Sequence, residues 1–381
     1  MIKAYKFRLY LSNEQRILVD KTFGCTRLIY NHYLNMKQKE YEETKTIKST
    51  FECIKDLKNL YVEKPFLKEV DSMSLRCAIF DLEDAYKRFY NKTGNYPRFK
   101  NKFGKNSYRT NYITSEYKGT KYENIKLDLV SKTITLPKLK EVRIRGYRNL
   151  DKIDGRIINA TVSKDASDRY YVSVVVEEPD KKINNIPNHI VGIDLGIKSL
   201  VVTSDGEKFN PLKPINKYEK RIKKLQRSLS RKVVGSSNYN KIKIRLGIVY
   251  RKIRNTRKYY LHGISKYLTD NHNIIVTETL KIKNMIKNHN LAKTITDSSW
   301  YELIRQIHYK SRYKGIKFYQ IESNYPSSQE CSVCGEINKE VKNLNIREWE
   351  CSECGNYHNR DINAAINIMV RGLRQYVEEL V

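Results

Sequence analysis

The stretch His189-Ile-Val-Gly-Ile-Asp194-Leu-Gly196 decides the fold of the second half of the chain. Its apolar residues predict a buried strand, and Asp194 interrupts that strand with a carboxylate beside the protein core. Burying a carboxylate is costly unless a cation or hydrogen-bond donors accompany it. We therefore expect other functional groups near Asp194.

Two further acids stand in similar settings. Glu278 follows the apolar strand predicted over residues 273–277, and Asp361 opens a C-terminal helix with an apolar stripe. Taken singly, each has an ordinary explanation: a turn at Asp194, a solvated strand end at Glu278, and a helix-dipole partner at Asp361. Three converging carboxylates would instead hold two divalent ions, with Asp194 bridging both. Oxygen ligands select Mg²⁺ or Mn²⁺.

Four cysteines form two Cys-x-x-Cys pairs, Cys331 with Cys334 and Cys351 with Cys354. A glycine follows each pair, and the spacing is typical of a structural zinc site with a closed tetrahedral shell. Zinc is therefore expected to fold this module rather than to take part in catalysis. The other three cysteines lie on predicted helices and are interpreted as core residues.

The charge predicts a polyanionic partner. Lys and Arg number 73 against 42 Asp and Glu, a net charge of +31, and such basicity is typical of nucleic-acid binding. Residues 213–258 contain seventeen Lys or Arg and one acid, Glu219. We interpret this run as a surface that tracks a phosphate backbone, the alternative being a solvated helix face. No run approaches the ~20 apolar residues of a membrane span, so no membrane partner is expected.

The periodicity divides the chain into an α+β multidomain protein. A strand is predicted over 1–10, helices from the Ser12 capping box and over 72–91, and short alternating strands from 122 to 176. We predict a β domain from residues 1–10 and 116–185, and a helical domain over 11–115. An α/β domain would comprise 189–325 and 358–381, interrupted by the zinc module at 326–357. Ser299-Trp-Tyr-Glu302 is interpreted as a second capping box.

The third segment resembles the RuvC-like nuclease of the TnpB family, RNA-guided nucleases encoded by insertion sequences and related to type V CRISPR effectors. The resemblance rests on Gly192-Ile-Asp-Leu-Gly-Ile-Lys198, on Val276-Thr-Glu278, on Ser327 to Gly335, and on Cys351 to Ile368. It implies an RNase H-like nuclease domain with an inserted zinc ribbon, preceded by a helical recognition domain and a β-barrel-like wedge domain. It also implies that Asp194, Glu278 and Asp361 are catalytic Mg²⁺ ligands and that the four cysteines bind zinc.

The resemblance further implies a guide RNA and a double-stranded DNA target as partners. Arg360 would lie beside the scissile phosphate, and Asn359 departs from the aspartate common in the family. The helical domain would read a short motif next to the target, with Ser72 and Arg76 as candidate readers. Arg98, Phe99 and Lys100 interleave cations with an aromatic ring, a composition suited to nucleic acid but also to a linker with core aromatics. Arg27 lies in a stretch that resembles the family more weakly, and it is a further candidate nucleic-acid contact.

The leading hypothesis is a metal-dependent, RNA-guided DNA endonuclease, expected as a monomer in the nucleoid-associated cytoplasm of a bacterium or archaeon. Three other hypotheses stay open. They are a guide-dependent DNA-binding protein without cleavage, a transposase that performs strand transfer itself, and a zinc-ribbon RNA-binding protein without catalysis. The last leaves Asp194 and Asp361 without a function.

Overall fold

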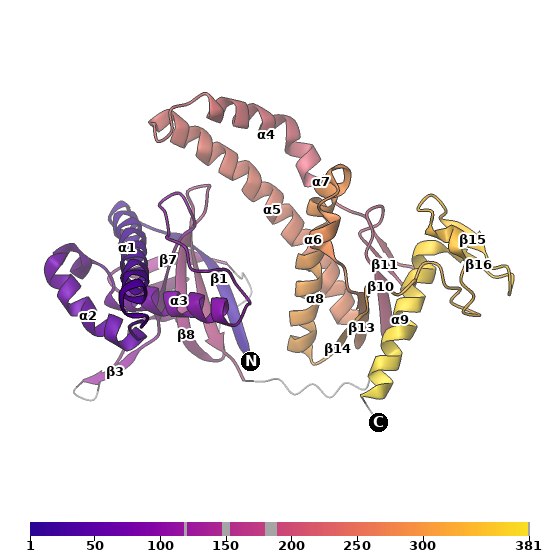
Figure 1. The fold of residues 1–381 in the computed structure, drawn as a ribbon, viewed down its shortest axis with the longest axis horizontal. Coiled ribbons are helices and arrows are strands. Elements are labelled where there is room, and N and C mark those ends of the chain that lie inside the picture. Colours follow the sequence, from indigo (N-terminus) through magenta and orange to yellow (C-terminus); the bar gives the residue numbers. More distant parts are fainter. Residues whose placement is uncertain (118–119, 147–152, 180–188, 380–381) are drawn as a thin grey trace. The chain divides into compact units, whose positions relative to one another are not determined.

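The computed structural model describes residues 1–117, 120–146, 153–179 and 189–379 (Figure 1). The chain forms two compact units, Met1–Asp180 and Lys181–Val381. No helix among the described residues is both long and apolar enough to cross a membrane.

The first unit contains a seven-stranded sheet of order β2-β8-β9-β1-β7-β6-β5, in which every pair is antiparallel. Alternating apolar residues fill one face and form a core around Phe7, Val162 and Val174. A separate hairpin, β3–β4, lies outside this sheet. The strands are β1 (Ile2–Tyr10), β2 (Asn106–Asn111), β3 (Thr114–Tyr117), β4 (Thr120–Glu123), β5 (Lys126–Asp128), β6 (Thr133–Leu136), β7 (Lys140–Arg145), β8 (Arg156–Lys164) and β9 (Tyr170–Glu177).

Apart from the β3–β4 hairpin, the predicted β segments share one sheet, in which β1 lies between β9 and β7. Two details differ from the expectation. The segment 11–115, predicted to be helical, contains β2, which pairs with β8. Among the described residues, β2 and β5 are the sheet's edges, so the barrel-like closure is not seen there. The predicted residues 180–185 lie outside the described part of the chain.

Three helices and a short 3-10 turn complete the described part of the first unit, with a core around Ile29, Leu60 and Ile79. The Ser12 capping box is present: Gln15 N donates to Ser12 Oγ at 3.2 Å, and Ser12 N donates to Gln15 Oε1 at 3.0 Å. Gly94 lies beyond the end of the third helix, and its N–H donates to Arg88 O. These elements are α1 (Asn13–Thr44), α2 (Thr50–Glu63), η1 (Pro65–Glu69) and α3 (Ser72–Tyr90).

The second unit is built on a five-stranded sheet of order β12-β11-β10-β13-β14. The last three strands of this order run parallel, and β11 and β12 are antiparallel additions at one edge. The strands are β10 (Ile190–Asp194), β11 (Val201–Thr203), β12 (Lys208–Phe209), β13 (Ile274–Glu278) and β14 (Lys317–Ile321).

Helices cover both faces of this sheet (Figure 1). Helices α5 (Ser237–Asn271) and α8 (Trp300–Lys314) pack on the face that carries Val191, Ile193 and Ile275. Helix α9 (Arg360–Glu378) packs on the opposite face, where its Ile368 contacts the side of the sheet that carries Val276. Asp194 and Glu278 alternate with Ile193 and Thr277, so they lie on the α9 face.

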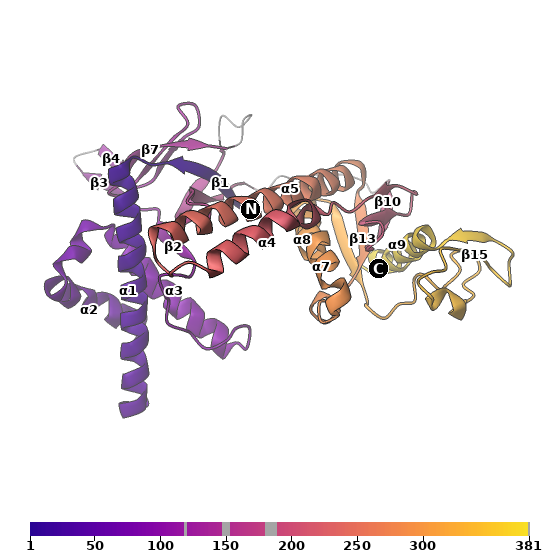
Figure 2. The ribbon, with the colours of Figure 1, turned by 90° about the horizontal axis from the view of Figure 1, so that it is seen from above.

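Helix α4 (Pro214–Ser230) lies along α5 in a hairpin that both views show (Figures 1 and 2). Two short helices, α6 (Ile282–Met285) and α7 (His289–Ser298), precede α8. The predicted capping box at Ser299 is wrong. Because α7 runs directly into Ser299, that residue adopts a left-handed conformation (φ 52°), and its hydroxyl donates to Thr296 O instead of capping α8.

The cysteine module contains η2 (Lys339–Lys342) and a hairpin of β15 (Glu348–Glu350) with β16 (Tyr357–Asn359). Strand β16 leads into α9 without an intervening residue. The predicted module boundary between residues 357 and 358 therefore falls inside a strand.

Candidate metal centres and nucleic-acid interface

Asp194 and Glu278 are neighbours at the ends of two parallel strands. The register pairs Ile193 with Thr277, and the next residue of each strand is Asp194 and Glu278. Paired residues of parallel strands project to the same face. The sheet alone therefore brings two of the three predicted carboxylates together.

Helix α9 brings Asp361 toward the same place. A Cβ on Gly192 would lie 2.0 Å from Ala365 O, so the helix backbone rests directly on β10 at this glycine. Asp361 precedes Ala365 by one helical turn on the same helix face, and Asp194 follows Gly192 by two residues on the same strand face. The close packing at Gly192 thus directs the first turn of α9 to the C-terminal ends of the strands.

The three carboxylates interact electrostatically. Burial raises the pKa of Asp194 to about 7, and repulsion from Glu278 and Asp361 adds to this effect, while the Arg360 guanidinium opposes it. Burial also raises the pKa of Glu278. Carboxylates that repel one another beside an apolar core form a site that a divalent cation would stabilise.

The triad is less tightly assembled than the thiols described below. In the described part of the chain, two groups of three or more His, Cys, Asp or Glu residues have one ligand atom from each member within 4.8 Å of the others. Asp194, Glu278 and Asp361 do not form such a group. Asp361 Oδ1 pairs with Arg347 Nη1 at 3.1 Å. Sequence reasoning missed Arg347, because a single arginine among the ribbon's polar residues gives no signal of its partner.

Arg360 is buried and binds the cysteine module. Its Nη1 donates to Asn343 O at 2.9 Å, and its guanidinium is close enough to Asp194 to lower the pKa of that acid. Burial lowers the pKa of Arg360. Its contact with a scissile phosphate stays a prediction.

The four thiols of the cysteine module lie together in one cluster. One sulfur from each of Cys331, Cys334, Cys351 and Cys354 lies within 4.8 Å of the others, and two cross-pairs lie at 3.5 and 3.6 Å. Sulfurs placed tetrahedrally at ~2.3 Å from zinc would be roughly 3.8 Å apart, so the spacing fits that ion.

The two halves of this cluster repeat the same backbone turn. Cys331 N donates to Glu336 O and Gly335 N to Cys331 O, as Cys351 N does to Asn356 O and Gly355 N to Cys351 O. Gly335 and Gly355 have φ of 84° and 67°, which favours glycine after each pair. The sequence prediction of two glycine-closed turns is confirmed.

Two residues outside the cysteine cluster contact its sulfur atoms. His358 is buried beside Trp349, and its Nε2 lies 3.1 Å from Cys331 Sγ. The Asn356 side-chain amide donates to Cys354 Sγ at 3.2 Å, and this hydrogen bond, with another from the Asn356 backbone, lowers the pKa of the Cys354 thiol to about 6. Such partners favour the thiolate form that binds metal.

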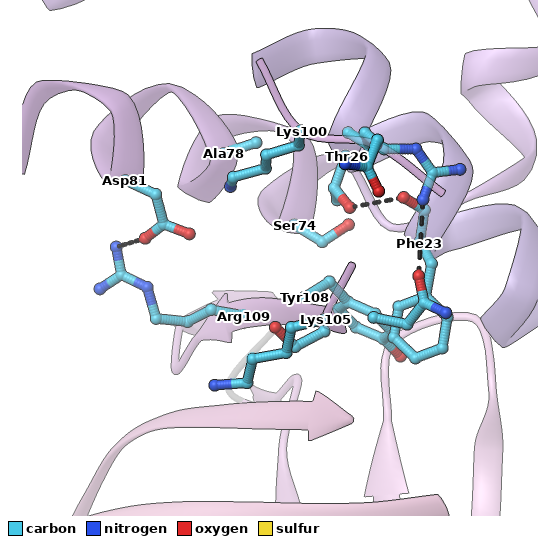
Figure 3. Close-up of a pocket in the computed structure, with 13 residues that line it drawn as sticks. Phe23, Thr26, Ser74, Ala78, Asp81, Lys100, Lys105, Tyr108 and Arg109 are labelled. Atoms are coloured by element: carbon cyan, nitrogen blue, oxygen red, sulfur yellow. Dashed lines mark hydrogen bonds and ion pairs between the residues drawn. The ribbon is translucent and has the colours of Figure 1, made fainter. Parts of the chain in front are cut away.

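The predicted nucleic-acid residues of the first unit separate into three places. Ser72 and Arg76 are exposed one turn apart on α3. Arg98 and Phe99 are exposed on the segment before β2. Arg27 and Lys100 instead line a small pocket between α1, α3 and β2 (Figure 3).

This pocket gathers cations that the sequence did not single out. Lys105 and Arg109 join Lys100, and Arg109 pairs with Asp81 at 2.8 Å (Figure 3). Asn31 fixes the Lys100 backbone through two hydrogen bonds of 2.8 Å. The cavity volume of about 30 Å³ corresponds to a few water molecules.

The basic run of the second unit lies on the α4–α5 hairpin. The two helices share a small core of Ile222, Val249 and Ile253. Cations line a hollow along the outside of α4, at Lys220, Lys223, Lys224, Arg227, Arg231 and Lys232. Part of the run is neutralised, since Arg257 pairs with the buried Asp297 and Lys223 with Glu219.

Comparison with known proteins finds relatives that align along nearly all of this chain. A relative from Streptomyces pristinaespiralis, named "Putative RNA-guided DNA endonuclease", is 34% identical over 377 residues, covering 97% of this chain and 89% of the relative. "Putative RNA-guided DNA endonuclease InsQ" of Escherichia coli K12 is 31% identical, covering 97% and 92%. Family models described as "Probable transposase", "Cas12f1-like, TNB domain" and "Helix-turn-helix domain" match residues 173–289, 300–368 and 1–46.

The chain belongs to the TnpB/IS605 family.

A solved structure shares the fold of this TnpB/IS605 family member. It is titled "Cryo-EM structure of the Cas12f1-sgRNA-target DNA complex" and aligns with a TM-score of 0.50 at 15% identity, covering 97% of this chain and 98% of that one. The helix-turn-helix model matches a region that here contains one strand and one long helix, β1 and α1.

Proposed function

We propose that this TnpB/IS605 family member is an RNA-guided DNA endonuclease of a transposable element, which hydrolyses target DNA beside a short flanking motif. The proposal assigns catalysis to Asp194, Glu278 and Asp361 in an RNase H-like domain, with the cysteine module as an inserted zinc ribbon. The names of two relatives that align along nearly all of this chain support the activity.

One observation carries the site assignment. Parallel pairing in register sets Asp194 beside Glu278, and the contact of α9 with Gly192 directs Asp361 to the same strand ends. Three acids from segments far apart in the chain repel one another at the C-terminal ends of these two strands. A merely structural role would not require this convergence.

The acids suit hard divalent cations. Mg²⁺ or Mn²⁺ would be held by the oxygens of Asp194, Glu278 and Asp361, and when bound would activate water and stabilise the leaving oxygen. Arg347 competes for Asp361, because it occupies Oδ1 of that carboxylate. Zn²⁺ would be held by the four thiols and would fold the ribbon.

The proposed partners are a guide RNA and a DNA duplex. The exposed cations of α4 suit a backbone-tracking surface, since they point away from the shared α4–α5 core. The pocket with Arg27, Lys100, Lys105 and Arg109 is the proposed contact with the flanking motif, together with Ser72 and Arg76 on α3.

The test is to purify the chain, sequence the RNA that co-purifies, and assay cleavage of a matching duplex. Cleavage should require Mg²⁺ and the RNA. Because chelators also strip zinc, the control omits Mg²⁺ without chelator and then restores it. Cleavage that does not depend on the RNA sequence, or that proceeds without divalent ions, would contradict the proposal.

A second candidate is a transposase that joins strands itself, because a family model described as "Probable transposase" covers the segment with Asp194 and Glu278. The same assay separates the two activities. Hydrolysis leaves free ends, whereas strand transfer yields a joined product of increased length.

A further inference from the structure

We propose a second type of metal site in the same unit, formed by His189, Asp205 and His272, that binds Zn²⁺ or a similar borderline cation. One ring nitrogen of each histidine and one carboxylate oxygen of Asp205 lie within 4.8 Å of one another. Two imidazoles and a carboxylate are a ligand set that such ions prefer, whereas Mg²⁺ favours oxygen alone.

The backbone holds the three residues together. His189 directly precedes β10, and its carbonyl accepts a hydrogen bond from Asn273 N at 2.9 Å, next to His272. Asp205 lies in the turn between β11 and β12, where Ser204 N donates to Gly192 O at 2.9 Å. Strand pairing therefore fixes all three positions without the metal.

The hydrogen bonds of His189 and His272 leave the Nε2 atom of each ring available to bind a metal. His272 Nδ1 lies 2.9 Å from Leu268 O and His189 Nδ1 lies 3.1 Å from Asn271 O. A carbonyl oxygen only accepts, so both Nδ1 atoms must carry the proton, and each neutral ring keeps its lone pair on Nε2. Donation from the other ring nitrogen to a carbonyl is the usual outer arrangement of a metal-binding histidine.

The contact between His272 and Asp205 requires a positive charge between its two atoms. His272 is 5% exposed, and its Nε2 lies 3.2 Å from Asp205 Oδ2. In the neutral ring this places a lone pair against a carboxylate oxygen. A proton on His272 alone would make this contact an ion pair with Asp205, but that pair would not include the lone pair of His189. Protonating both rings would repel, since they stack at 4.8 Å between centroids with an interplanar angle of 16°. A single shared cation satisfies both lone pairs and the carboxylate.

This site is separate from the carboxylate triad. His189 and Asp194 stand at opposite ends of β10, five residues apart, which corresponds to roughly 16 Å along an extended strand. Three protein ligands leave a coordination position for water. The bound ion would connect the starts of β10 and β13 to the β11–β12 turn.

The test counts zinc in the full-length chain. Protein that has kept its ribbon zinc is dialysed, saturated with Mg²⁺ to occupy the carboxylates, and titrated with Zn²⁺ by calorimetry and metal analysis. We expect one additional Zn²⁺ per chain. His189→Ala and Asp205→Asn, both at exposed positions, should weaken this binding by about 100-fold or more, since loss of outer partners alone costs 10–100-fold.

The matched control is His308→Ala, which removes an exposed histidine of the same unit outside the cluster. It should bind the additional Zn²⁺ like the unchanged protein. Co²⁺ gives a second measurement, because only the ribbon's thiolates produce sulfur-to-cobalt charge-transfer absorption. Equal Zn²⁺ uptake by His189→Ala and the unchanged chain, equal loss in His308→Ala, or no additional Zn²⁺ in the unchanged chain would each overturn the proposal.

Discussion

The four thiols and the three carboxylates are both candidate metal sites of one unit, yet they are assembled in different ways. The thiols come from 24 consecutive residues, 331–354, and two repeated backbone turns bring all four sulfurs together. The carboxylates come from β10, β13 and α9: strand pairing brings two of them together, and the packing of a helix on the sheet adds the third.

This difference separates two functions of a metal. A local, closed shell of thiolates lets the ion fold its own module. The three acids come from segments far apart in the chain and repel one another, and Arg347 pairs with Asp361, so a metal proposed there would bind to a fold that already exists. The predictions below test this contrast, from the largest expected effect to the smallest.

Removing zinc should unfold the ribbon, because structural zinc contributes on the order of 10 kcal/mol in small modules, and the ribbon's own core is small. Trp349 is buried there, while the other tryptophan, Trp300, lies in the core of the sheet domain. Stripping zinc should therefore shift tryptophan emission to longer wavelength. Trp349→Phe should abolish the shift; an unchanged spectrum after verified zinc loss would show that the ribbon folds by itself.

Asp194→Asn should lower the cleavage rate by about 1000-fold or more, since loss of a metal-bridging carboxylate removes several kcal/mol of transition-state stabilisation. Guide and target binding should change by less than about 2-fold, as the fold does not depend on this ion. Asp270→Asn, at an exposed acid of the same unit, is the control and should cleave normally. Loss of binding in Asp194→Asn would contradict the assignment.

Gly192→Ala should destabilise the second unit by about 1–3 kcal/mol, because the new methyl group would meet Ala365 O at 2.0 Å. Moving α9 would also displace Asp361, so cleavage should fall. Gly263→Ala is the matched substitution: it lies on α5 with nothing within 4 Å and should be neutral or slightly stabilising. Thermal unfolding measures both, and equal melting temperatures would show that α9 does not rest on β10.

The pKa of Asp194, raised to about 7, predicts a specific pH dependence. Between about pH 4, where an unfolded aspartate ionises, and pH 7 the folded chain binds more protons than the unfolded one, so stability should fall as pH rises. The free energy of unfolding should fall by at most about 1.4 kcal/mol per pH unit, and it should fall less steeply in Asp194→Asn. Melting temperatures in Mg²⁺-free buffer measure it. Added Mg²⁺ near pH 8 should restore stability.

Arg347→Ala should change stability by less than about 1 kcal/mol, because its pair with Asp361 is partly exposed. Freeing Asp361 should nevertheless lower the Mg²⁺ concentration needed for half-maximal cleavage. Arg371→Ala removes a comparable exposed pair with Glu322 and should leave that concentration unchanged. The same Mg²⁺ dependence in both variants would mean that Arg347 does not restrain the triad.

Local patterns predicted much of this molecule. Continuous apolar residues located β10 and β13, and cysteine spacing located the assembled thiols. Asp194, Glu278 and Asp361 were singled out because each interrupts or ends an apolar element, and the strand register then makes two of them neighbours.

Long-range pairing explains what the sequence missed. Strand β2 pairs with β8 across about fifty residues, and this pairing brings Lys105 and Arg109 to the pocket of Lys100. The Ser299 prediction failed because the preceding α7 leaves no extended residue before α8. His272 meets Asp205 only through the sheet, so no local spacing marks the pair.

The junction of β16 with α9 has a practical consequence for anyone who shortens or exchanges parts of this chain. Asn359 is the last residue of β16, and its side chain accepts from Ile362 N to begin the helix that carries Asp361. A graft made at this point would tilt the helix and misplace its acid. A replacement module should therefore keep residues 357–361 intact.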